Sequence, residues 1–252
     1  MVAIDHASSK YKNSDYAQYS ITAWHKYAEK INCEFCVVNR SQFPDDVRPI
    51  WNKELISSYG VGFDKIAVID SDTLPSPNCP NLFDTFTEDE FCGVNDLCDL
   101  NWLFGSIDVY QKFFSDVEMD IFKYVNAGVL FFGKKHLHIF DRVLKTYFDN
   151  KEELDNWDKG GGREQTLLNF VLREQAVDVT LLSPAWNLLA IERKNMFTNN
   201  WQLWYGLDCK FEAPMYWPHF MRYANIWHFT GFPIEDRTRL MRKTFEFLHG
   251  YE

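Results

Sequence analysis

Two apolar runs, each of strand length, constrain most strongly what this chain can fold into. Residues 65–69 read Lys-Ile-Ala-Val-Ile, and residues 125–132 read Val-Asn-Ala-Gly-Val-Leu-Phe-Phe. A strand with apolar side chains at successive positions buries both of its faces, which is typical of the central strands of a mostly parallel sheet. The two runs therefore predict a layered α/β fold, with helices on both sides of a mostly parallel sheet.

Further strands and helices are expected to alternate around these two runs, as apolar periodicity indicates. Strands are expected at residues 2–5, 34–38, 91–95, 177–182 and 225–229. Helices are expected at residues 15–31, 47–59, 135–148, 163–175 and 235–248. No internal repeat is visible, and 252 residues suit one domain, so we expect a single domain over residues 1–252.

Three segments are expected to depart from this alternation. The segment 106–124 is expected to be a helical insertion. Pro75 and Pro77 are expected to prevent any strand or helix after residue 73, because proline fixes φ and lacks the backbone N–H donor. Residues 151–162 are polar and end in three glycines, which predicts a flexible loop.

The charge and cysteine content exclude some classes of partner and location. The net charge is −10 and no basic stripe is visible, so a nucleic-acid-binding surface is not expected. The N-terminus has no basic stretch followed by an apolar run, and no segment approaches the length of a membrane-spanning helix. Cys33 and Cys36 fall on opposite faces of an expected strand, so they are predicted to be free thiols. A cytoplasmic protein is therefore expected.

Aromatic residues are frequent, at 17% of the chain, and they concentrate between Phe197 and Tyr223. Most are expected to pack in the core or in small apolar clusters. An alternative is that one or two exposed rings there form a platform for the apolar face of a sugar. The sequence leaves both interpretations open.

Two carboxylates follow the first apolar run directly, at Asp70 and Asp72. Ligands of open α/β sheets bind at the carboxyl ends of strands. Positions i and i+2 point the same way in extended backbone, so the two acids would repel each other unless a cation neutralised them. A hard divalent ion would do so, and it could bridge the two phosphates of a nucleoside diphosphate.

This acid pair also has two other interpretations. One is a solvated turn in which Asp70 caps the next segment. The other is a phosphatase of the haloacid-dehalogenase type, whose D-x-D-x-[T/V] motif the triplet resembles. Leu74 stands at the position where that motif has Thr or Val, and about 60 residues precede the acids here, whereas the phosphatase motif usually opens its chain. The phosphatase is therefore the weaker alternative.

Three later segments carry further polar residues at strand or helix ends. Asn126, Ala127 and Gly128 open the second apolar run, where Gly permits close approach of a ligand. Glu164 and Gln165 stand in the first turn of an expected helix, where an acid also suits the helix dipole. His228 ends an expected strand, and a lone His is more often a hydrogen-bonded core residue than a ligand.

Taken in order, these segments resemble the retaining glycosyltransferases of family eight, which have the GT-A fold and include glycogenin and bacterial galactosyltransferases. The family patterns are D-x-D, N-[S/A]-G-V, D-Q with an Asn four residues later, and H-[F/Y]-x-G. The matching segments are Asp70-Ser71-Asp72, Asn126-Ala127-Gly128-Val129, Glu164-Gln165 with Asn169, and His228-Phe229-Thr230-Gly231. The resemblance spans residues 2–232 and implies a single GT-A catalytic domain that closes with the helix 235–248.

The resemblance implies a role for each of these residues. Asp70, Asp72 and His228 would bind manganese, with magnesium as the alternative, and the imidazole would favour manganese. The donor would be a nucleotide-sugar, expected to be UDP-linked, bound by Asp5, Asp70, Ser71, Asn126, Ala127, Gly128, Gly231 and Arg237. Glu164 and Gln165 would lie beside the anomeric carbon and act in catalysis. The acceptor would be a hydroxyl group of a glycan or another molecule.

The chain departs from the family at two positions. Glu164 stands where the family has Asp, which lengthens the side chain. The family often has a Lys soon after H-x-x-G to hold the diphosphate, and here the nearest cations are Arg237 and Arg239. Either arginine would substitute for that Lys, or the metal would carry more of the diphosphate charge.

Two other classes of protein fit the same layout. A nucleotidyltransferase would need a glycine-rich basic loop near the N-terminus, and residues 8–12 contain lysines but no glycine. A carbohydrate-binding protein that has lost activity would have no reason to keep Asp70, Asp72 and His228 together. Transfer of a sugar to a hydroxyl acceptor, with retention of anomeric configuration, is therefore the preferred hypothesis.

Overall fold

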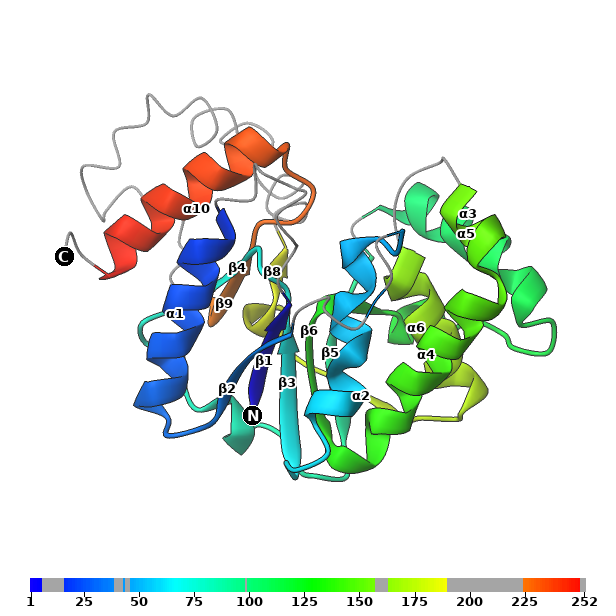
Figure 1. Ribbon diagram of the computed structural model, residues 1–252, viewed down its shortest axis with the longest axis horizontal. Coiled ribbons are helices and arrows are strands. Elements are labelled where there is room, and N and C mark those ends of the chain that lie inside the picture. The colour runs from blue at the N-terminus through cyan, green and yellow to red at the C-terminus, as the bar shows by residue number, and fades with distance from the viewer. Residues whose placement is uncertain are drawn as a thin grey trace.

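The structure, a computed structural model, describes residues 1–5, 16–38, 43, 46–97, 99–156, 163–189 and 224–249. Within these residues the chain forms a six-stranded sheet and a three-stranded sheet, with helices on both sides (Figure 1). The predicted α/β fold with a mostly parallel sheet flanked by helices is confirmed.

The large sheet has the strand order β2-β1-β3-β6-β5-β7. Its strands are β1 (Val2–Asp5), β2 (Phe35–Val38), β3 (Lys65–Ile69), β5 (Phe91–Asn95), β6 (Val125–Gly133) and β7 (Val179–Leu181). Strand β6 runs antiparallel to its neighbours β3 and β5, whereas the other pairs are parallel. The two apolar runs from which the fold was predicted are therefore adjacent strands, with Ile69 opposite Val129.

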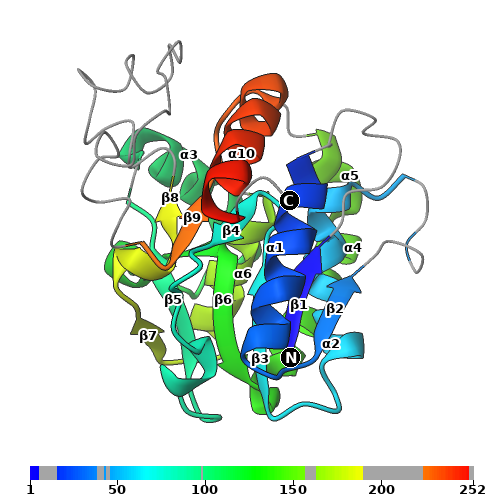
Figure 2. The same ribbon diagram turned by 90° about the vertical axis from the view of Figure 1, so that its left-hand side faces the viewer.

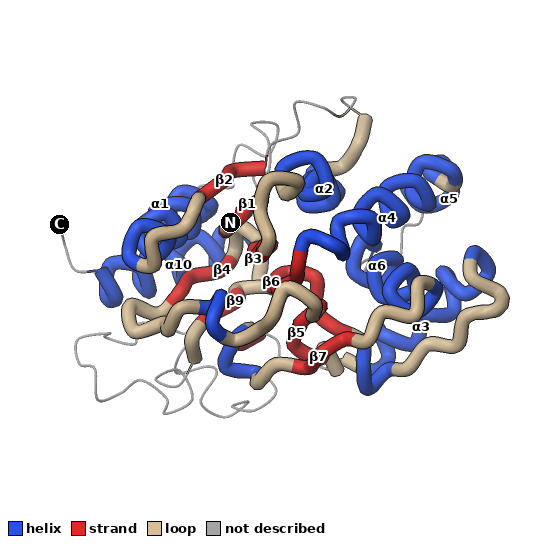
Figure 3. The backbone as a smooth tube through the Cα atoms, turned by 90° about the horizontal axis from the view of Figure 1, so that it is seen from below, coloured by secondary structure: helices blue, strands red, loops and turns tan. Residues whose placement is uncertain are grey.

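The helices form two layers, which Figures 1 and 3 show on either side of the strands. The helices are α1 (Tyr16–Lys30), α2 (Ile56–Tyr59), α3 (Leu100–Tyr110), α4 (Leu137–Asp149), α5 (Lys151–Asn156), α6 (Arg163–Glu174) and α10 (Ile234–His249). Helices α1 and α10 lie together on one side, where the rings of Tyr19 and Phe245 are 5.6 Å apart (Figure 2). Each described helix is too short or too polar to cross a bilayer.

Core residues cover both faces of the large sheet, and every residue of its strand β6 is therefore buried. On one face, Leu130 and Phe132 belong to a cluster that includes residues of α4 and α6. On the other face, Val129 and Phe131 belong to a cluster that includes Trp24 of α1. Alternate residues of one strand thus bind the sheet to both helix layers, as expected for a central strand.

The small sheet has the order β4-β9-β8 and contains two strands that the sequence did not predict. Its strands are β4 (Thr73–Pro75), β8 (Leu188–Leu189) and β9 (Ile226–His228). The expectation that Pro75 and Pro77 prevent a strand after residue 73 is wrong. Pro75 is the last residue of an edge strand, where a missing N–H donor is tolerated.

Two helix predictions and one loop prediction are also corrected. Within residues 47–59 a 3₁₀ helix, Pro49–Leu55, is followed by the short α2. The helix begins at residue 49 rather than 47 because proline suits the first position of a helix. Residues 106–124 contain the end of α3 and the 3₁₀ turns Gln111–Phe113 and Ile121–Lys123, and α3 begins at Leu100 where Asp99 accepts the Trp102 N–H. The first half of the predicted loop 151–162 forms α5, and residues 157–162 lie outside the described part of the structure.

Candidate functional site

The structure brings Asp70, Asp72 and His228 together at one end of the two sheets. Asp70 follows β3, and Asp72 precedes β4, which pairs with β9 so that Thr73 lies opposite His228. The backbone N–H of Phe229 donates to the Asp72 carbonyl at 2.9 Å and fixes this pairing. One ligand atom from each of the three side chains lies within 4.8 Å of the other two. These atoms are close enough to bind one cation.

Gly128 allows the acid and the imidazole to approach each other. It lies on β6, where its carbonyl accepts the Asp70 N–H at 2.8 Å. A Cβ atom at position 128 would lie 2.3 Å from His228 Cε1 and 2.8 Å from Asp70 Oδ2. Both distances are shorter than van der Waals contact, so any other residue at this position would displace two of the three side chains.

These three residues fit a divalent cation by their chemistry as well as their positions. Two carboxylates and one imidazole are ligands that suit Mn²⁺, and the carboxylates also suit Mg²⁺. His228 Nε2 lies 3.0 Å from Asp72 Oδ1, but the two atoms are not aligned for a hydrogen bond. His228 is 2% exposed and Asp72 8%, so water contributes little to stabilising the imidazole and the acid.

Two cations lie beside the acid pair. Lys53, from the 3₁₀ helix Pro49–Leu55, places Nζ 2.5 Å from Asp70 Oδ1 and 3.4 Å from Glu164 Oε1. Arg237, from α10, places its guanidinium 3.0 Å from Asp72 Oδ2. Burial is the largest single influence and acts to raise the pKa of Asp72, but the neighbouring positive groups, Arg237 foremost and Lys53 among them, together outweigh it and hold that pKa below its usual range.

The structure separates the two arginines that the sequence offered as diphosphate contacts. Arg237 contacts Asp72, whereas Arg239 pairs with Asp236 at 2.9 Å on the same helix. Gly231 lies in the turn between β9 and α10 and has φ of 75°, a left-handed conformation that favours glycine. This turn sets where α10 begins after His228, and therefore where Arg237 lies.

The predicted residues Asn126, Ala127 and Gln165 share one hydrogen-bond cluster. Gln165 Oε1 accepts from the side chain of Asn126 at 2.9 Å and from the Ala127 N–H at 3.1 Å. The side-chain amides of Asn126 and Gln165 both donate to Asp96 Oδ2 at 3.0 Å. Asn169 exchanges two hydrogen bonds of 2.8 Å with the backbone of Val125, which fixes α6 against β6. The start of α6 is thereby held beside the start of β6.

Glu164 lies at the boundary between this cluster and the charged residues. Its side chain is buried, and burial raises the pKa of its carboxyl, although Lys53 acts in the opposite direction. Oε1 faces Lys53, and Oε2 makes no hydrogen bond with any residue that the structure describes. A buried carboxylate oxygen without a donor is available to a bound ligand.

The remaining predicted residues are placed less closely. Ser71, which stands between the two acids in the sequence, has a buried side chain. Asp5 is the last residue of β1, and its side chain lies outside the described part of the structure. Residues 197–223, where an aromatic sugar platform was one interpretation, also lie outside it.

Lys53, Asp96 and Asn187 are site residues that the sequence did not reveal. Lys53 lies in a segment that was predicted only as a helix, and Asp96 follows a strand without any matching motif. Asn187 lies between the 3₁₀ turn Pro184–Trp186 and β8 and is fully buried. The position of Asp96 just past a strand end is a signal that could have found it.

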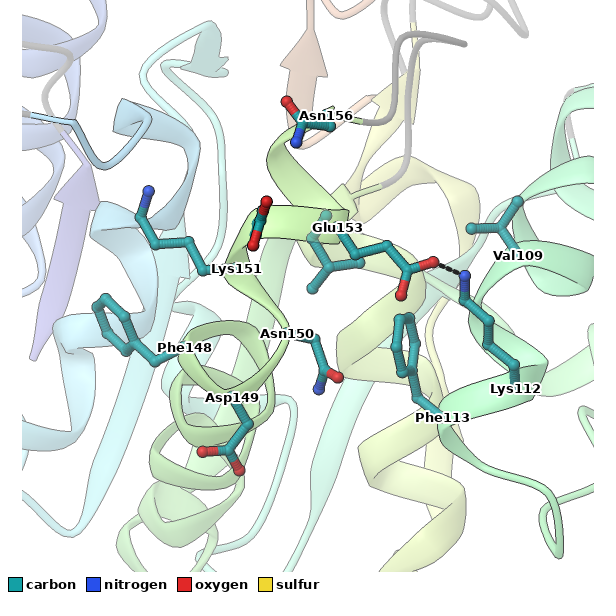
Figure 4. Close-up of a pocket in the computed structure, with 11 residues that line it drawn as sticks. Val109, Lys112, Phe113, Phe148, Asp149, Asn150, Lys151, Glu153 and Asn156 are labelled. Atoms are coloured by element: carbon teal, nitrogen blue, oxygen red, sulfur yellow. Dashed lines mark ion pairs between the residues drawn. The ribbon is translucent and has the colours of Figure 1, made fainter.

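A separate cavity of about 850 Å³ opens between α3 and α5 (Figure 4). An ion pair between Lys112 and Glu153 crosses it, and Phe113 and Phe148 contribute aromatic surface. None of the predicted site residues lines this cavity.

The fold is shared with solved glycosyltransferases. A glycosyltransferase involved in the glycosylation of the major capsid of PBCV-1 aligns over 96% of this chain and 98% of its own, with a TM-score of 0.59 and 13% identity. The galactosyltransferase LgtC, solved with donor and acceptor sugar analogues, aligns over 96% of both chains with a TM-score of 0.56 and 16% identity. The bifunctional glycosyltransferase WbbM aligns over 95% of this chain and 49% of its own, with a TM-score of 0.57 and 17% identity.

These similarities define the class of fold as that of the GT-A glycosyltransferases. No known sequence family matches the chain. No curated protein matches it by sequence either. At identities of 13–17%, the comparisons establish the fold alone.

Proposed function

We propose that this chain is a glycosyltransferase that moves a sugar from a nucleoside-diphosphate donor, UDP in particular, to a hydroxyl acceptor. The observation that carries the proposal is the convergence of Asp70, Asp72 and His228, whose ligand atoms lie within 4.8 Å of one another beside the bare backbone of Gly128. The GT-A fold supports the same function, because its solved members that align here are glycosyltransferases.

In this proposal Asp70, Asp72 and His228 hold a divalent cation. Manganese is favoured over magnesium because an imidazole completes the ligand set. When bound, the ion supplies positive charge that stabilises the departing diphosphate. Arg237 lies 3.0 Å from Asp72 and would add charge at the same place. Ser71, between the two acids in the sequence, and Gly231, three residues after His228, are proposed to contact the donor as well.

The donor is proposed to lie along the start of β6 and the end of β1. Asp5 would contact the base or ribose, and Asn126, Ala127 and Gly128 would contact the donor sugar. Gly128 has no side chain to exclude a ligand that reaches the acids. The acceptor is proposed to be a glycan or another molecule with a free hydroxyl, in line with the acceptor analogue bound to LgtC.

Glu164 and Gln165 are proposed to act at the anomeric carbon, with retention of configuration. The acceptor oxygen forms a bond to the anomeric carbon as the bond between this carbon and the diphosphate oxygen breaks. The proton of the acceptor hydroxyl leaves with the nucleoside diphosphate. Glu164 Oε2 is buried and makes no hydrogen bond within the described chain, so it can interact with positive charge that develops there. Gln165 is held by four hydrogen-bond partners and would orient Asn126.

Release of UDP tests this function. Purified protein with Mn²⁺ and a panel of UDP-sugars should release UDP, and a chelator should abolish the release. Asp72→Ala should lower turnover by about 1,000-fold or more, because several kcal/mol of charge stabilisation are lost with the cation. Asp116→Ala, at an exposed carboxylate, is the matched control and should keep the wild-type rate.

The other classes predict different products from the same samples. A nucleotidyltransferase would release pyrophosphate, and a phosphatase would release phosphate from monoesters without UDP. A carbohydrate-binding protein would bind sugar without turnover. Full turnover in a folded Asp72→Ala variant would refute the proposed metal site.

A further inference from the structure

A chain of buried hydrogen bonds connects the backbone of β6 to the ring of His228. The Gly128 N–H donates to Asn126 Oδ1 at 2.9 Å. Asn187 Nδ2 donates to the same oxygen at 2.9 Å. Asn187 Oδ1 lies 2.9 Å from His228 Nδ1. The side chains of Asn126, Asn187 and His228 thus form one connected series that begins at a backbone amide.

This series fixes the orientation of every amide in it. A backbone N–H can only donate, so the atom of Asn126 that faces Gly128 must be its oxygen. The group of Asn187 that faces this oxygen must therefore be its NH₂, which leaves the oxygen of Asn187 toward the imidazole. An amide oxygen only accepts, so His228 Nδ1 must carry the hydrogen.

The consequence falls on the other ring nitrogen. A neutral imidazole with hydrogen on Nδ1 has its lone pair on Nε2. Nε2 is the atom that lies 3.0 Å from Asp72 Oδ1, within the cluster of ligand atoms. Asn187 and His228 are 0% and 2% exposed, so water does not compete for these bonds.

We propose that Asn187 is a positioning residue, which holds the lone pair of His228 toward Asp70 and Asp72 and connects that ring to Asn126. The proposal rests on the proposed function for the nature of the cation and for the role of Asn126 at the donor sugar. The hydrogen-bond assignment rests only on the contacts above. Metal-binding histidines generally have their second nitrogen fixed in this way, and loss of such a partner costs about 10- to 100-fold in metal affinity.

A bond that merely satisfied a buried amide would leave the tautomer and the metal affinity unchanged when it was removed. Two variants of Asn187 distinguish the roles. Asn187→Leu removes both the acceptor for His228 and the donor to Asn126. Asn187→Asp keeps an acceptor for the Nδ1 hydrogen but cannot donate to Asn126. Gln111→Leu is the control, because it removes another amide, whose NH₂ donates to the backbone carbonyls of Phe114 and Val117 rather than acting at the site.

The experiment is nitrogen NMR of the full chain labelled with ¹⁵N-histidine, recorded at a pH where the His228 ring carries one proton. Wild type should show hydrogen on Nδ1, and Asn187→Leu should show a mixture of both tautomers. Mn²⁺ affinity, measured from the EPR signal of free Mn²⁺, should fall by about 10- to 100-fold in Asn187→Leu. Gln111→Leu should keep the wild-type tautomer and bind Mn²⁺ within about threefold of wild type. Asn187→Asp should also keep the wild-type tautomer and should bind Mn²⁺ at least as tightly as wild type does, within about threefold.

Hydrogen on Nε2 in the wild type would overturn the proposal, as would a folded Asn187→Leu with unchanged tautomer and Mn²⁺ affinity. If Asn187→Leu does not fold, the tautomer in the wild-type spectrum and the tautomer and Mn²⁺ affinity of Asn187→Asp still test the proposed role of Asn187. Neither measurement depends on turnover. A wild-type protein without transferase activity would therefore contradict the proposed function and leave the role of Asn187 to these spectra.

Discussion

The candidate site has two halves whose polar groups are stabilised in different ways. The charged half comprises Lys53, Glu54, Asp70, Asp72, Glu164 and Arg237. The amide half comprises the side-chain amides of Asn126, Gln165 and Asn187, with Asp96 as the acid that accepts from two of them. In the amide half, directional hydrogen bonds anchored on backbone N–H groups of β6 fix each side chain. In the charged half, buried ions depend on one another for neutralisation, and Glu164 retains an oxygen without a donor.

This difference indicates which half responds to a ligand. The hydrogen-bonded amides have a defined geometry without any ligand, so they can serve as a rigid frame. The ions of the charged half are stable only while their charges balance, and a bound cation or diphosphate changes that balance. We therefore expect the charged half to rearrange on binding, with Lys53 released from Asp70 as the cation takes its place.

Lys53→Met should have the largest effect on stability, because it leaves Asp70 and Glu164 without the ammonium that neutralises them. Breaking a buried ion pair costs about 3 kcal/mol or more, and for a chain of this size this corresponds to a fall in Tm of about 6–12 °C. Thermal unfolding followed by circular dichroism measures it. Added Mn²⁺ should recover part of the loss, since a cation beside Asp70 restores the charge.

Lys112→Met is the matched control. Lys112 pairs with Glu153 across the cavity between α3 and α5, but both side chains are half exposed. An exposed pair contributes about 0–1 kcal/mol, so its Tm should change by no more than about 4 °C. Equal losses in the two variants would show that the charged half is not stabilised by balanced buried charges.

The two halves also differ in how far the sequence predicted them. Asp70 and Asp72 were predicted because they follow an apolar strand, whereas His228 was predicted as a ligand only by the family resemblance. Lys53 was missed because the segment was interpreted as an α-helix. In the structure every residue from 51 to 56 is buried, so this segment has no solvent-facing side on which Lys53 could lie.

In the amide half, Asn126 and Gln165 were predicted by their motifs, whereas Asn187 was not. Asn187 depends on β8, a strand of two residues that shows no periodicity of its own. Its position is created by pairing with β9, and that strand lies about 40 residues further along the chain. The large sheet was predictable because β3 and β6 are mainly apolar runs, but strands as short as β8 form only through tertiary pairing.

Gly128→Ala should disturb both halves, because Gly128 contacts His228, Asp70 and Asn126 together. A Cβ atom would lie 2.3, 2.8 and 3.0 Å from atoms of these three side chains. We expect Mn²⁺ affinity to fall by about 10- to 100-fold, as when a metal ligand loses its orientation. Titration followed by EPR measures the affinity.

Gly105→Ala provides the control within α3. No atom lies within 4 Å of the position that its Cβ would take, and alanine favours the interior of a helix. This variant should bind Mn²⁺ as wild type does. Unchanged affinity in a folded Gly128→Ala protein would mean that the close packing around Gly128 has no role in binding.

Glu54→Gln should have the smallest effect, and it tests whether the charged half carries an unbalanced acid. Glu54 is fully buried, and neither carboxylate oxygen has a hydrogen-bond partner among the described residues. Burial raises the pKa of Glu54 well above 4.5; Lys53 lowers it, whereas Glu164 and Asp70 raise it further.

The sign of the pH dependence follows from this raised pKa. The folded protein binds the proton more tightly than the unfolded chain, so stability is fully present below about pH 4.5 and is lost as pH rises through the folded pKa. Glutamine resembles the protonated acid and does not titrate.

Glu54→Gln should therefore raise Tm by a few degrees at pH 8, on the order of 1–2 kcal/mol, with the difference closing toward pH 4.5. Distant acids titrate in both proteins and cancel in the difference, whereas Glu164 interacts with Glu54 and contributes to that difference. Glu118→Gln, at an exposed side chain, should give a difference that does not vary with pH. Tm curves for wild type and Glu54→Gln that stay parallel across this pH range would show that the pKa of Glu54 is not raised by folding. The charged half would then contain no unbalanced acid at this position.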